Sequence, residues 1–450
     1  MKVLILSLPG NNYELNFRNH YHSGFPTPHY ESFMLSGYLQ KNRYAPQIMD
    51  FNNQIDLKTL YDEIENTDAV FMVIDWHNLE FFHNLLQNID SPRKNIPLIA
   101  AGRFATLFPD YILFDYPVDF IIREEIEPTL LSILGELRKK KKGDPYNLKG
   151  ISFAKNGDIF HNKENKPLGN KKFEELPYPA YEKITPGKYQ LLTLETSRGY
   201  PYQDIFNSMN YEKNWRYSSP TTIYEKLYRS QEHHLMDFEK KFYYIQDLYF
   251  TAKGKRLIDL ADTIKNRKEN FRLIYKSRCS DILDQEFIFD FKKFTRKILF
   301  FPYCGYNRGL MNIRQGYNKK VIMDSARLLR KLEVEAEYNF VLGLPGETEN
   351  EINKTISFAG KINRETGQQV KISFYRLLPG CRNWNEKEKA GLISPGFFTE
   401  LPSNLNDWQK ISLSAFSNES INNLACRLEE LEENSGYNCY KEPLFQFLHW

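Results

Sequence analysis

The chain has few cysteines and no long apolar run, and both absences narrow its class. Its 450 residues include five cysteines, an odd number at irregular spacing that argues against a disulfide framework. The longest apolar stretches, at residues 2–8 and 69–74, are far shorter than the ~18 residues of a membrane helix. No small-residue cleavage site follows the first stretch, which ends at Pro9-Gly10. The sequence therefore predicts a cytoplasmic protein with reduced thiols and no membrane span.

A large excess of charge of one sign is also missing. The chain has 60 Lys and Arg against 57 Asp and Glu, and this net charge of +3 indicates neither nucleic acid nor an acidic membrane as a partner. Walker, GxSxG and HExxH motifs are absent too, so phosphoryl transfer, acyl transfer and zinc hydrolysis have no support. What the chain does contain is 41% hydrophobic residues, including 33 Phe and 29 Tyr, a composition typical of a folded globular protein.

Short apolar runs alternate with helical patterns over residues 1–140. Strands are expected near 2–8, 45–50, 69–74, 96–101 and 118–122, with a last helix near 127–138. This rhythm predicts an α/β fold with a doubly wound, Rossmann-like parallel sheet. Ligands bind such sheets at the carboxyl ends of the strands, so the loops that follow the strands form the candidate site.

A Pro-rich segment at 141–187, with a small hairpin around Asn156-Gly157, is expected to link this domain to a second one. Six more strands are predicted near 190–196, 242–246, 271–276, 297–301, 336–343 and 370–376. Alternating with helices, they predict a six-stranded partial β/α barrel at 188–392, with its function on the loops after the strands. Residues 393–450 are left as a tail with a helical pattern near 420–434.

Several segments, in this order and spacing, resemble the cobalamin-binding radical SAM proteins. They are 118–130 (VDFIIREEIEPTL), 176–181 (LPYPAY), 195–199 (ETSRG), 215–220 (WRYSSP) and 340–348 (FVLGLPGET). The resemblance covers roughly residues 1–395 and implies a corrinoid-binding doubly wound domain followed by a (β/α)6 partial TIM barrel of the radical SAM type. It also implies cobalamin and S-adenosylmethionine (SAM) as cofactors. By resemblance, the residues of the corrinoid-domain loops are Pro9, Gly102, Arg103, Arg123 and Glu125.

The segment after the first barrel strand departs from the family pattern SRGCPxxCxxC. Three thiolates in this pattern hold three irons of a 4Fe-4S cluster, and the fourth iron chelates SAM. Here Arg198 is retained, but Tyr200, Asp204 and Asn207 occupy the three cysteine positions. Oxygen-bearing side chains are poor ligands for an iron–sulfur cluster and suit hydrogen bonding or a hard cation better. We therefore expect the 4Fe-4S cluster to be absent.

Other departures leave cobalamin and SAM binding open. Cys304 stands where the family has a glutamate near the SAM ribose, and Glu124 and Ile126 replace two glycines of a corrinoid loop. Cys279, Cys304 and Cys381 follow the third, fourth and sixth barrel strands, so a relocated metal site is one alternative. The favoured interpretation is that these thiols are buried apolar fillers.

Two classes of function remain. The favoured one is a helper protein, a pseudoenzyme that binds a substrate, a corrinoid or a partner enzyme without a cluster. The alternative is an enzyme of the cobalamin/SAM type, catalysing methyl transfer or a related rearrangement at a repurposed site. Arg103, Arg123 and Arg198 face Glu125 and Asp204 at the expected mouth, and this mixed charge favours a polar ligand, such as a small molecule or a peptide.

Overall fold

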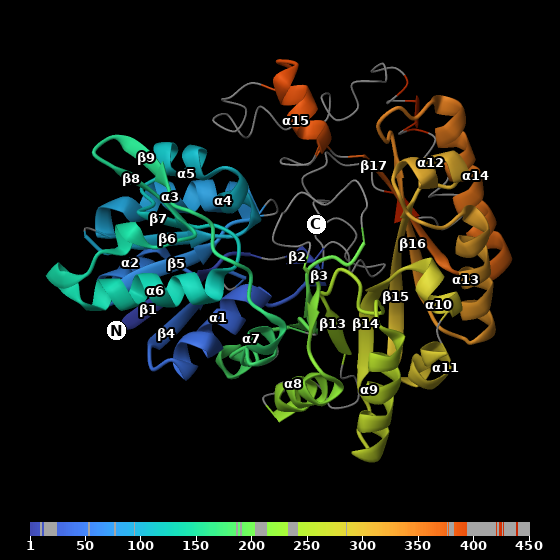
Figure 1. The fold of residues 1–450 in the computed structure, drawn as a ribbon, viewed down its shortest axis with the longest axis horizontal. Coiled ribbons are helices and arrows are strands. Elements are labelled where there is room, and N and C mark those ends of the chain that lie inside the picture. Colours follow the sequence, from blue (N-terminus) through green and yellow to red (C-terminus); the bar gives the residue numbers. More distant parts are fainter. Residues whose placement is uncertain are drawn as a thin grey trace.

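Two seven-stranded sheets organise the chain, and the computed structural model places them side by side (Figure 1). The structure describes residues 1–9, 11–12, 25–52, 55–75, 78–93, 95–185, 188–189, 191–202, 214–232, 242–284, 286–375, 377, 382–393, 420, 423–424, 426 and 438–439. Among these residues, no helix combines the length and the hydrophobicity needed to cross a bilayer.

The first sheet begins with five parallel strands. In spatial order they are β4 (Ala45–Asp50), β1 (Lys2–Ser7), β5 (Ala69–Val73), β6 (Leu98–Ala101) and β7 (Phe120–Ile122). Along the chain this order is 2-1-3-4-5, so the connections leave β1 in opposite directions on its two sides. Such a switch point opens a crevice at the carboxyl ends of β1 and β5. The predicted doubly wound sheet is confirmed.

Helices cover both faces of these strands, which explains why the central strands β5 and β6 are apolar throughout, whereas the edge strand β4 carries the exposed Gln47. Leu4 and Leu6 of β1 are buried on one face, whereas Val3 and Ile5 are buried on the other. The first face packs against α2 (Leu57–Glu65), α3 (Leu79–Arg93), α4 (Arg103–Leu107) and α5 (Pro109–Asp115). The second packs against α1 (Tyr30–Lys41) and α6 (Ile126–Arg138).

The expected hairpin forms, and it extends the first sheet. β8 (Ile151–Lys155) pairs antiparallel with β7 and with β9 (Asp158–His161). Asn156 and Gly157 both have positive φ values, 56° and 89°, as a two-residue hairpin turn requires. Along the chain, the hairpin is preceded by the short turns η3 (Lys140–Lys142) and η4 (Pro145–Asn147). It is followed by the helix α7 (Asn170–Glu174) and the turn η5 (Tyr181–Lys183). The segment 141–187 therefore adds strands as well as joining the two sheets.

The second sheet is parallel throughout, as predicted. Its order is β10 (Leu192–Leu194), β13 (Phe242–Ile245), β14 (Arg272–Ser277), β15 (Thr295–Tyr303), β16 (Ala336–Leu342), β17 (Gln369–Phe374) and β18 (Asn438–Cys439). Within the described part of the chain β10 and β18 do not pair, so the barrel is open. The six expected strands are all present, and β18 is an addition from the tail.

Helices α8 to α14 follow the strands of the partial barrel. They are α8 (Pro220–Glu232), α9 (Gly254–Asn266), α10 (Cys279–Asp284), α11 (Phe287–Phe291), α12 (Asn307–Asn312), α13 (Lys319–Lys331) and α14 (Glu349–Thr366). α14 shows why the chain turns helical there, because Thr348 and Glu351 form a capping box and Gly367 ends the helix in the left-handed region. α15 (Arg382–Lys389) follows β17.

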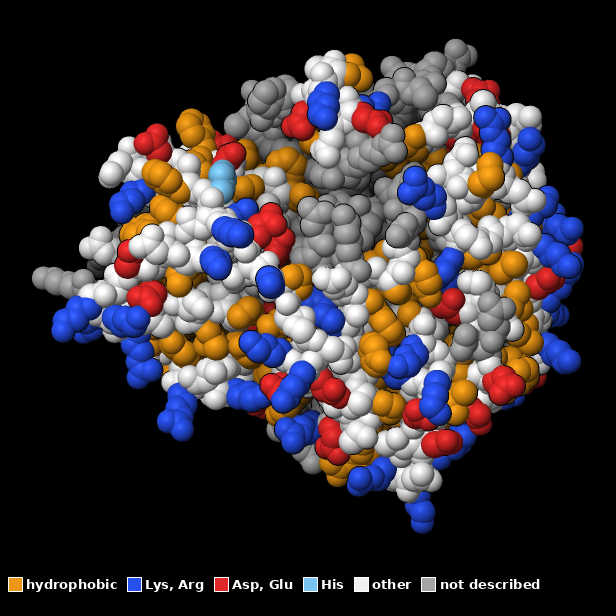
Figure 2. All heavy atoms as spheres, viewed as in Figure 1, with side chains coloured by type: hydrophobic (Ala, Val, Ile, Leu, Met, Phe, Trp, Pro, Cys, Tyr) orange, Lys and Arg blue, Asp and Glu red, His pale blue; other side chains and the backbone are white. Residues whose placement is uncertain are grey.

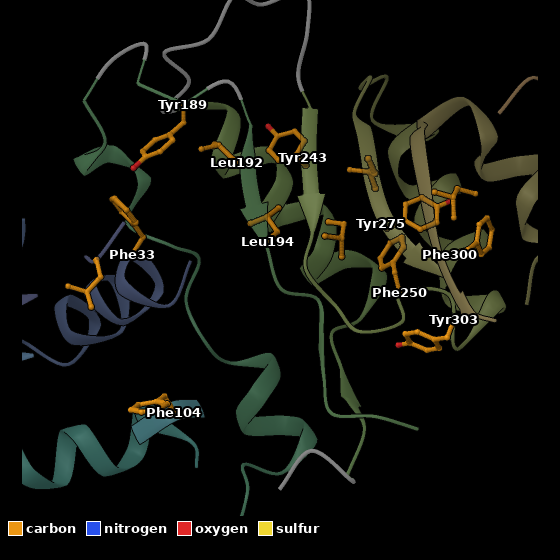
Figure 3. Close-up of a cluster of buried hydrophobic side chains, with 14 of the residues drawn as sticks. Phe33, Phe104, Tyr189, Leu192, Leu194, Tyr243, Phe250, Tyr275, Phe300 and Tyr303 are labelled. Atoms are coloured by element: carbon orange, nitrogen blue, oxygen red, sulfur yellow. The ribbon is translucent and has the colours of Figure 1, made fainter. Parts of the chain in front are cut away.

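One continuous apolar core joins the two sheets. Figure 3 shows Phe33 and Phe104 from the first domain in the same cluster as Leu194, Phe250 and Phe300 from the barrel. Figure 2 shows Lys and Arg side chains projecting along the lower left edge of the first domain. The two domains therefore share packing as well as a linker.

The linker packs closely on α1 at Gly37. A Cβ at Gly37 would lie 2.6 Å from the carbonyl oxygen of Tyr178, whereas a Cβ at Gly135 of α6 would meet no atom within 4 Å. Ala at either position gains ~0.5–1 kcal/mol of helix propensity. We expect Gly135→Ala to be stabilising and Gly37→Ala to be destabilising by ~1–3 kcal/mol, because backbone must move. Urea unfolding of both variants measures this, and equal gains would contradict the close approach.

Candidate functional site

The first barrel strand ends in a corner that a buried carboxylate holds. Asp247, at the end of β13, accepts hydrogen bonds from the Thr196 backbone N–H (2.7 Å) and from the Thr196 and Ser197 hydroxyls (2.6 Å each). The Arg256 guanidinium lies 3.7 Å from the same carboxylate. Immediately after this corner, β11 (Ser197–Arg198) pairs with β12 (Arg216–Tyr217). The described start of the segment that resembles the family's cluster loop, residues 197–202, therefore lies at the barrel mouth.

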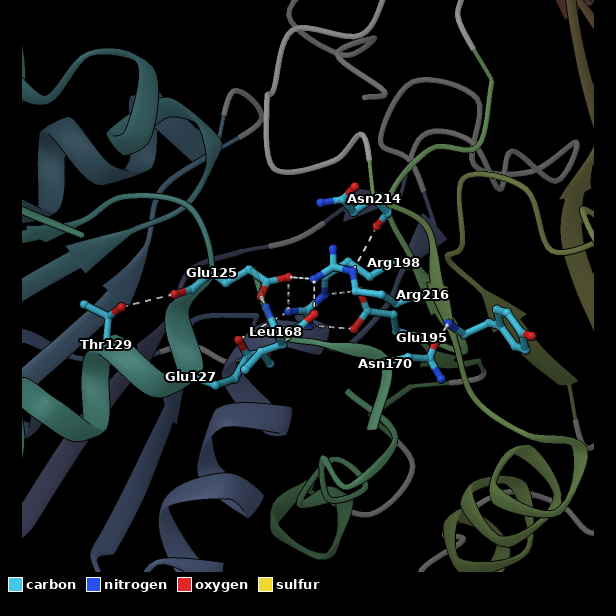
Figure 4. A network of polar contacts seen from close by, with 10 residues as sticks. Glu125, Glu127, Thr129, Leu168, Asn170, Glu195, Arg198, Asn214 and Arg216 are labelled. Atoms are coloured by element: carbon cyan, nitrogen blue, oxygen red, sulfur yellow. Dashed lines mark hydrogen bonds and ion pairs between the residues drawn. The ribbon is translucent and has the colours of Figure 1, made fainter. Parts of the chain in front are cut away.

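Arg198 connects this corner to the first domain. Its Nε and Nη2 atoms donate to the two Glu195 carboxylate oxygens at 3.0 and 2.8 Å. Its Nη2 and Nη1 atoms also donate to the Glu127 carboxylate at 2.8 and 3.2 Å (Figure 4). Because Glu127 lies in the first turn of α6, the guanidinium bridges the two domains.

Arg216 makes a second bridge beside the first. Its Nη1 atom pairs with Glu125 and donates to the carbonyl of Leu168 at 3.1 Å, while the Leu168 N–H donates to Glu125. The Nε atom donates to the carbonyl of Asn214 at 2.9 Å. We call Glu125, Glu127, Glu195, Arg198 and Arg216 together the junction.

The junction is buried, so its charges are only weakly screened. The side chains of Glu127 and Arg216 are 2% and 5% exposed. Burial alone would raise the pKa of Glu127, but the Arg198 guanidinium holds it below its usual range. Burial raises the pKa of Glu195, and Arg198 offsets this only in part. Removing one partner of such a network leaves a buried charge unpaired, which is strongly destabilising.

Two of the residues predicted to bind cofactors therefore hold the domains together. The side chains of Arg198 and Glu125 both form hydrogen bonds and ion pairs within the junction. Sequence reasoning did not identify Glu127, Glu195 and Arg216 as their partners. A signal was present, since the segments 118–130, 195–199 and 215–220 that carry the family resemblance contain all five junction residues.

The carboxyl edge of the first sheet carries the other predicted corrinoid-loop residues. Gly102 has φ +109°, and a Cβ there would lie 2.3 Å from the Ile74 carbonyl oxygen, so close backbone packing requires the glycine. Asp75, after β5, accepts from the Arg103 N–H at 2.9 Å. Pro9 and Arg103 are partly exposed at this edge. The structure thus brings Pro9, Gly102 and Arg103 to the switch-point side of the sheet.

The loop after β7 has a left-handed backbone conformation of the kind that glycine favours, but a glutamate occupies the position. Glu124 has φ +71°, a left-handed conformation that costs a non-glycine residue roughly 1 kcal/mol or more. Burial, followed by the nearby Glu164, raises the pKa of Glu124 to about 6. Arg123 donates to the carbonyl of Asn162 and so ties this loop to the chain that follows the hairpin.

The first cysteine position of the family pattern is filled by a packed aromatic ring. Tyr200 is buried, with its ring centroid 5.9 Å from Tyr202 and 5.4 Å from Tyr249. The Arg278 guanidinium lies 3.9 Å over the Tyr202 ring, and the Tyr202 hydroxyl donates to Asp281 at 3.3 Å. Asp204 and Asn207 lie outside the described residues. This end of the loop is built as an aromatic and cationic cluster and supplies no thiolate.

The described barrel cysteines are buried in separate surroundings. Burial raises the pKa of Cys279 and of Cys304 to about 12, so both thiols are neutral when no metal is bound. Cys279 lies by Ser325 and Tyr317, whereas the Cys304 thiol donates to the carbonyl of Tyr306. Cys381 is outside the described residues, within which no three His, Cys, Asp or Glu are placed to hold a metal.

Glu347, in the segment 340–348, is a titratable group that sequence reasoning did not single out. One carboxylate oxygen accepts from the Gly343 and Leu344 N–H groups at 2.7 and 3.0 Å. Burial raises the pKa of Glu347 to about 7, although these backbone donors act in the opposite direction. A buried carboxyl group that changes charge near neutrality therefore lies directly after β16 at the barrel mouth.

Comparison with known proteins agrees with this geometry. No family model matches the chain. It is 25% identical over 302 residues to the uncharacterized methyltransferase PH0819 of Pyrococcus horikoshii, covering 65% of this chain and 63% of that protein. It is 24% identical to the uncharacterized protein MJ0966 of Methanocaldococcus jannaschii, over 80% of this chain and 76% of that one.

Solved structures share the arrangement of both domains. The cobalamin-dependent SAM radical enzyme OxsB, with aqua-cobalamin and SAM bound, superposes with a TM-score of 0.66 at 19% identity over 80% of this chain. The radical SAM methyltransferase TsrM of Kitasatospora setae, with cobalamin and a [4Fe-4S] cluster, gives 0.65 at 13% identity over 88% of this chain and 76% of its own. This chain spans less than two thirds of PH0819 and about half of OxsB, 52%. The predicted fold is confirmed.

The junction predicts that two Glu→Gln substitutions, one buried and one exposed, differ strongly in their effect on the free energy of unfolding. Glu127→Gln should destabilise the protein by ~3 kcal/mol, because one charge of a buried pair is removed while the arginine remains. Glu365→Gln removes the partner of the exposed Arg327 and should have a much smaller effect. Urea unfolding midpoints compare the two. Equal effects would show that Glu127 contributes no more than a surface charge.

Glu347 predicts a pH dependence of opposite sign to that of most carboxylates. Because its pKa is raised in the folded state, its contribution to stability is fully present below the unfolded value of 4.5 and is lost as the pH rises through about 7. As the pH falls from about 8 to about 5, the wild type should therefore gain stability relative to Glu347→Gln. Glu351, whose pKa is lowered by its bond to the Thr348 N–H, supplies the control Glu351→Gln. For this control the stability difference should stay nearly constant over the same range, because a lowered pKa loses its contribution only below the unfolded value of 4.5. Matching trends in both comparisons would be evidence against the assignment.

Proposed function

We propose that this chain, which has the fold of the cobalamin-dependent radical SAM enzymes, is a corrinoid-binding helper protein that works without a 4Fe-4S cluster. Its ligand would lie between the carboxyl edge of the first sheet and the barrel mouth. The observation that carries the proposal is the junction, because it joins the two domains beside both candidate edges, while Tyr200 stands at the first cysteine position of the family pattern.

The edge of the first sheet supplies the groups that would contact a corrinoid. Pro9 and Arg103 are partly exposed there, and Gly102 lies close against the backbone of Ile74, just after β5. Arg103 would donate to the peripheral amides of the ring, and the Glu124 loop would limit how deeply the ring enters. When bound, a corrinoid supplies a cobalt centre able to carry a methyl group. OxsB and TsrM, which share this fold, bind cobalamin.

The cluster-free part of the proposal rests on side-chain chemistry. Tyr200 supplies a phenol at the first cysteine position, and Cys279 and Cys304 are held as buried neutral thiols. Reductive cleavage of SAM needs an iron with an open coordination position, which these residues do not provide. A binding or partner role is therefore favoured over radical catalysis.

A second candidate is a cluster-free methyltransferase. The name of the relative PH0819 favours it, since that protein is described as an uncharacterized methyltransferase. Under this alternative, Glu347 would be a group able to exchange a proton at neutral pH. Methyl transfer from SAM to cob(I)alamin, added in the reduced state, separates the two candidates. A methyltransferase would form methylcob(III)alamin and release S-adenosylhomocysteine, whereas a helper protein would not.

The proposal predicts the spectrum and the metal content of the protein. After anaerobic reconstitution with iron and sulfide, the chain should carry no stoichiometric iron and no broad band near ~400 nm. It should bind hydroxocobalamin in equilibrium dialysis, and Arg103→Ala should weaken binding by roughly 10-fold, as loss of one charged hydrogen bond does. Arg296→Ala, which breaks a pair with Glu335 on the barrel, is the matched control. Stoichiometric iron and sulfide, or no corrinoid binding, would refute it.

A further inference from the structure

The balanced net charge of the chain hides a strong local imbalance. Residues 138–172 contain 11 Lys and Arg against three Asp and Glu, a net charge of +8, whereas the other 415 residues carry 49 and 54, a net charge of −5. Of the 11 cations, Arg138 and nine lysines have described side chains, and all of these are exposed. We call this segment the basic face. In Figure 2, Lys and Arg side chains project along the lower left edge, beside the position of α6.

Hydrogen bonds join several parts of the basic face. The Gly150 N–H donates to the Lys163 carbonyl at 2.8 Å, and the Asn165 side chain donates to the Lys149 carbonyl at 3.2 Å. These bonds place Lys149 and Lys163 side by side. The Asp144 N–H donates to Glu136 at 3.2 Å and so joins this surface to the end of α6.

Aromatic rings are exposed among these lysines. Phe160 is 43% and Tyr146 is 36% exposed, and the Lys155 ammonium lies 4.6 Å over the Tyr146 ring. Phe153 stacks beneath Phe160 with a centroid distance of 5.4 Å, which holds that ring at the surface. Lysines interleaved with supported aromatic rings are typical of surfaces that follow a phosphodiester backbone and stack bases.

We propose that the basic face binds a nucleic acid through its phosphodiester backbone. A protein partner fits less well, because lysine is depleted at protein–protein interfaces while aromatic residues and arginine are enriched. Within the described residues of the basic face, Lys139 has the one lysine–carboxylate ion pair, with Glu136, so the remaining described ammonium groups need not give up a carboxylate to contact phosphate. This inference does not depend on corrinoid binding, and it replaces the sequence expectation of no nucleic-acid partner.

Fluorescence anisotropy with labelled RNA and DNA strands of about 20 nucleotides tests the proposal on the full chain. Binding should weaken at least ~10-fold between about 50 and about 200 mM salt, because counterions are released. The double variant Lys149→Glu/Lys163→Glu should weaken binding at least ~10-fold and reduce the salt slope by about two. A preference for RNA would indicate contacts to the 2′-hydroxyl, whereas equal binding would indicate the backbone alone.

The control is Lys319→Glu/Lys320→Glu, which reverses two exposed lysines at the start of α13 on the barrel. This variant should bind nucleic acid like the wild type, and both variants should retain the wild-type melting temperature. The proposal is overturned if the wild type binds neither strand, or if the two double variants weaken binding equally. It is also overturned if polyglutamate or anionic vesicles displace the strands at equal charge concentration, because the face would then select charge alone.

Discussion

Arg198 lies between carboxylates of two domains, and the relation between the two sheets depends on it. The guanidinium pairs with Glu195 at the end of the first barrel strand and with Glu127 at the start of α6. Both carboxylates and the guanidinium are largely desolvated, so their ion pairs must offset a desolvation cost of several kcal/mol per ion. A buried network of this kind is worth little as net stability but strongly disfavours alternative domain positions, since any shift would leave a buried charge unpaired.

Two junction residues stand next to loops that are candidates for ligand binding. Arg198 precedes Tyr200 by two residues, and Glu125 follows the strained Glu124 directly. In each segment one residue, Arg198 or Glu125, forms ion pairs between the domains, and the adjacent loop lies at the edge of the crevice.

Much of the fold could be predicted because its strands are buried on both faces. A run such as 69–74 stands out in the sequence, since parallel strands covered by helices on both faces are mostly apolar. The strand β16 is less plain, because it buries Glu337, which pairs with Lys297 at 2.7 Å. The two-residue strand β18 carries no such pattern. Side-chain partners were also beyond reach, because Arg198 pairs with a residue 71 positions away and Arg216 with one 91 positions away. Periodicity places a residue on a loop but does not reveal which loop it meets.

The central claim is that this fold holds a corrinoid at the edge of the first sheet and no cluster at the barrel mouth. Anomalous X-ray diffraction at the cobalt and iron edges, from crystals reconstituted with hydroxocobalamin, iron and sulfide, tests it most directly. The account predicts one cobalt peak over the loops that contain Pro9, Gly102 and Arg103, and no iron peak beside Tyr200. An iron peak at the mouth, or the absence of a cobalt peak, would contradict it.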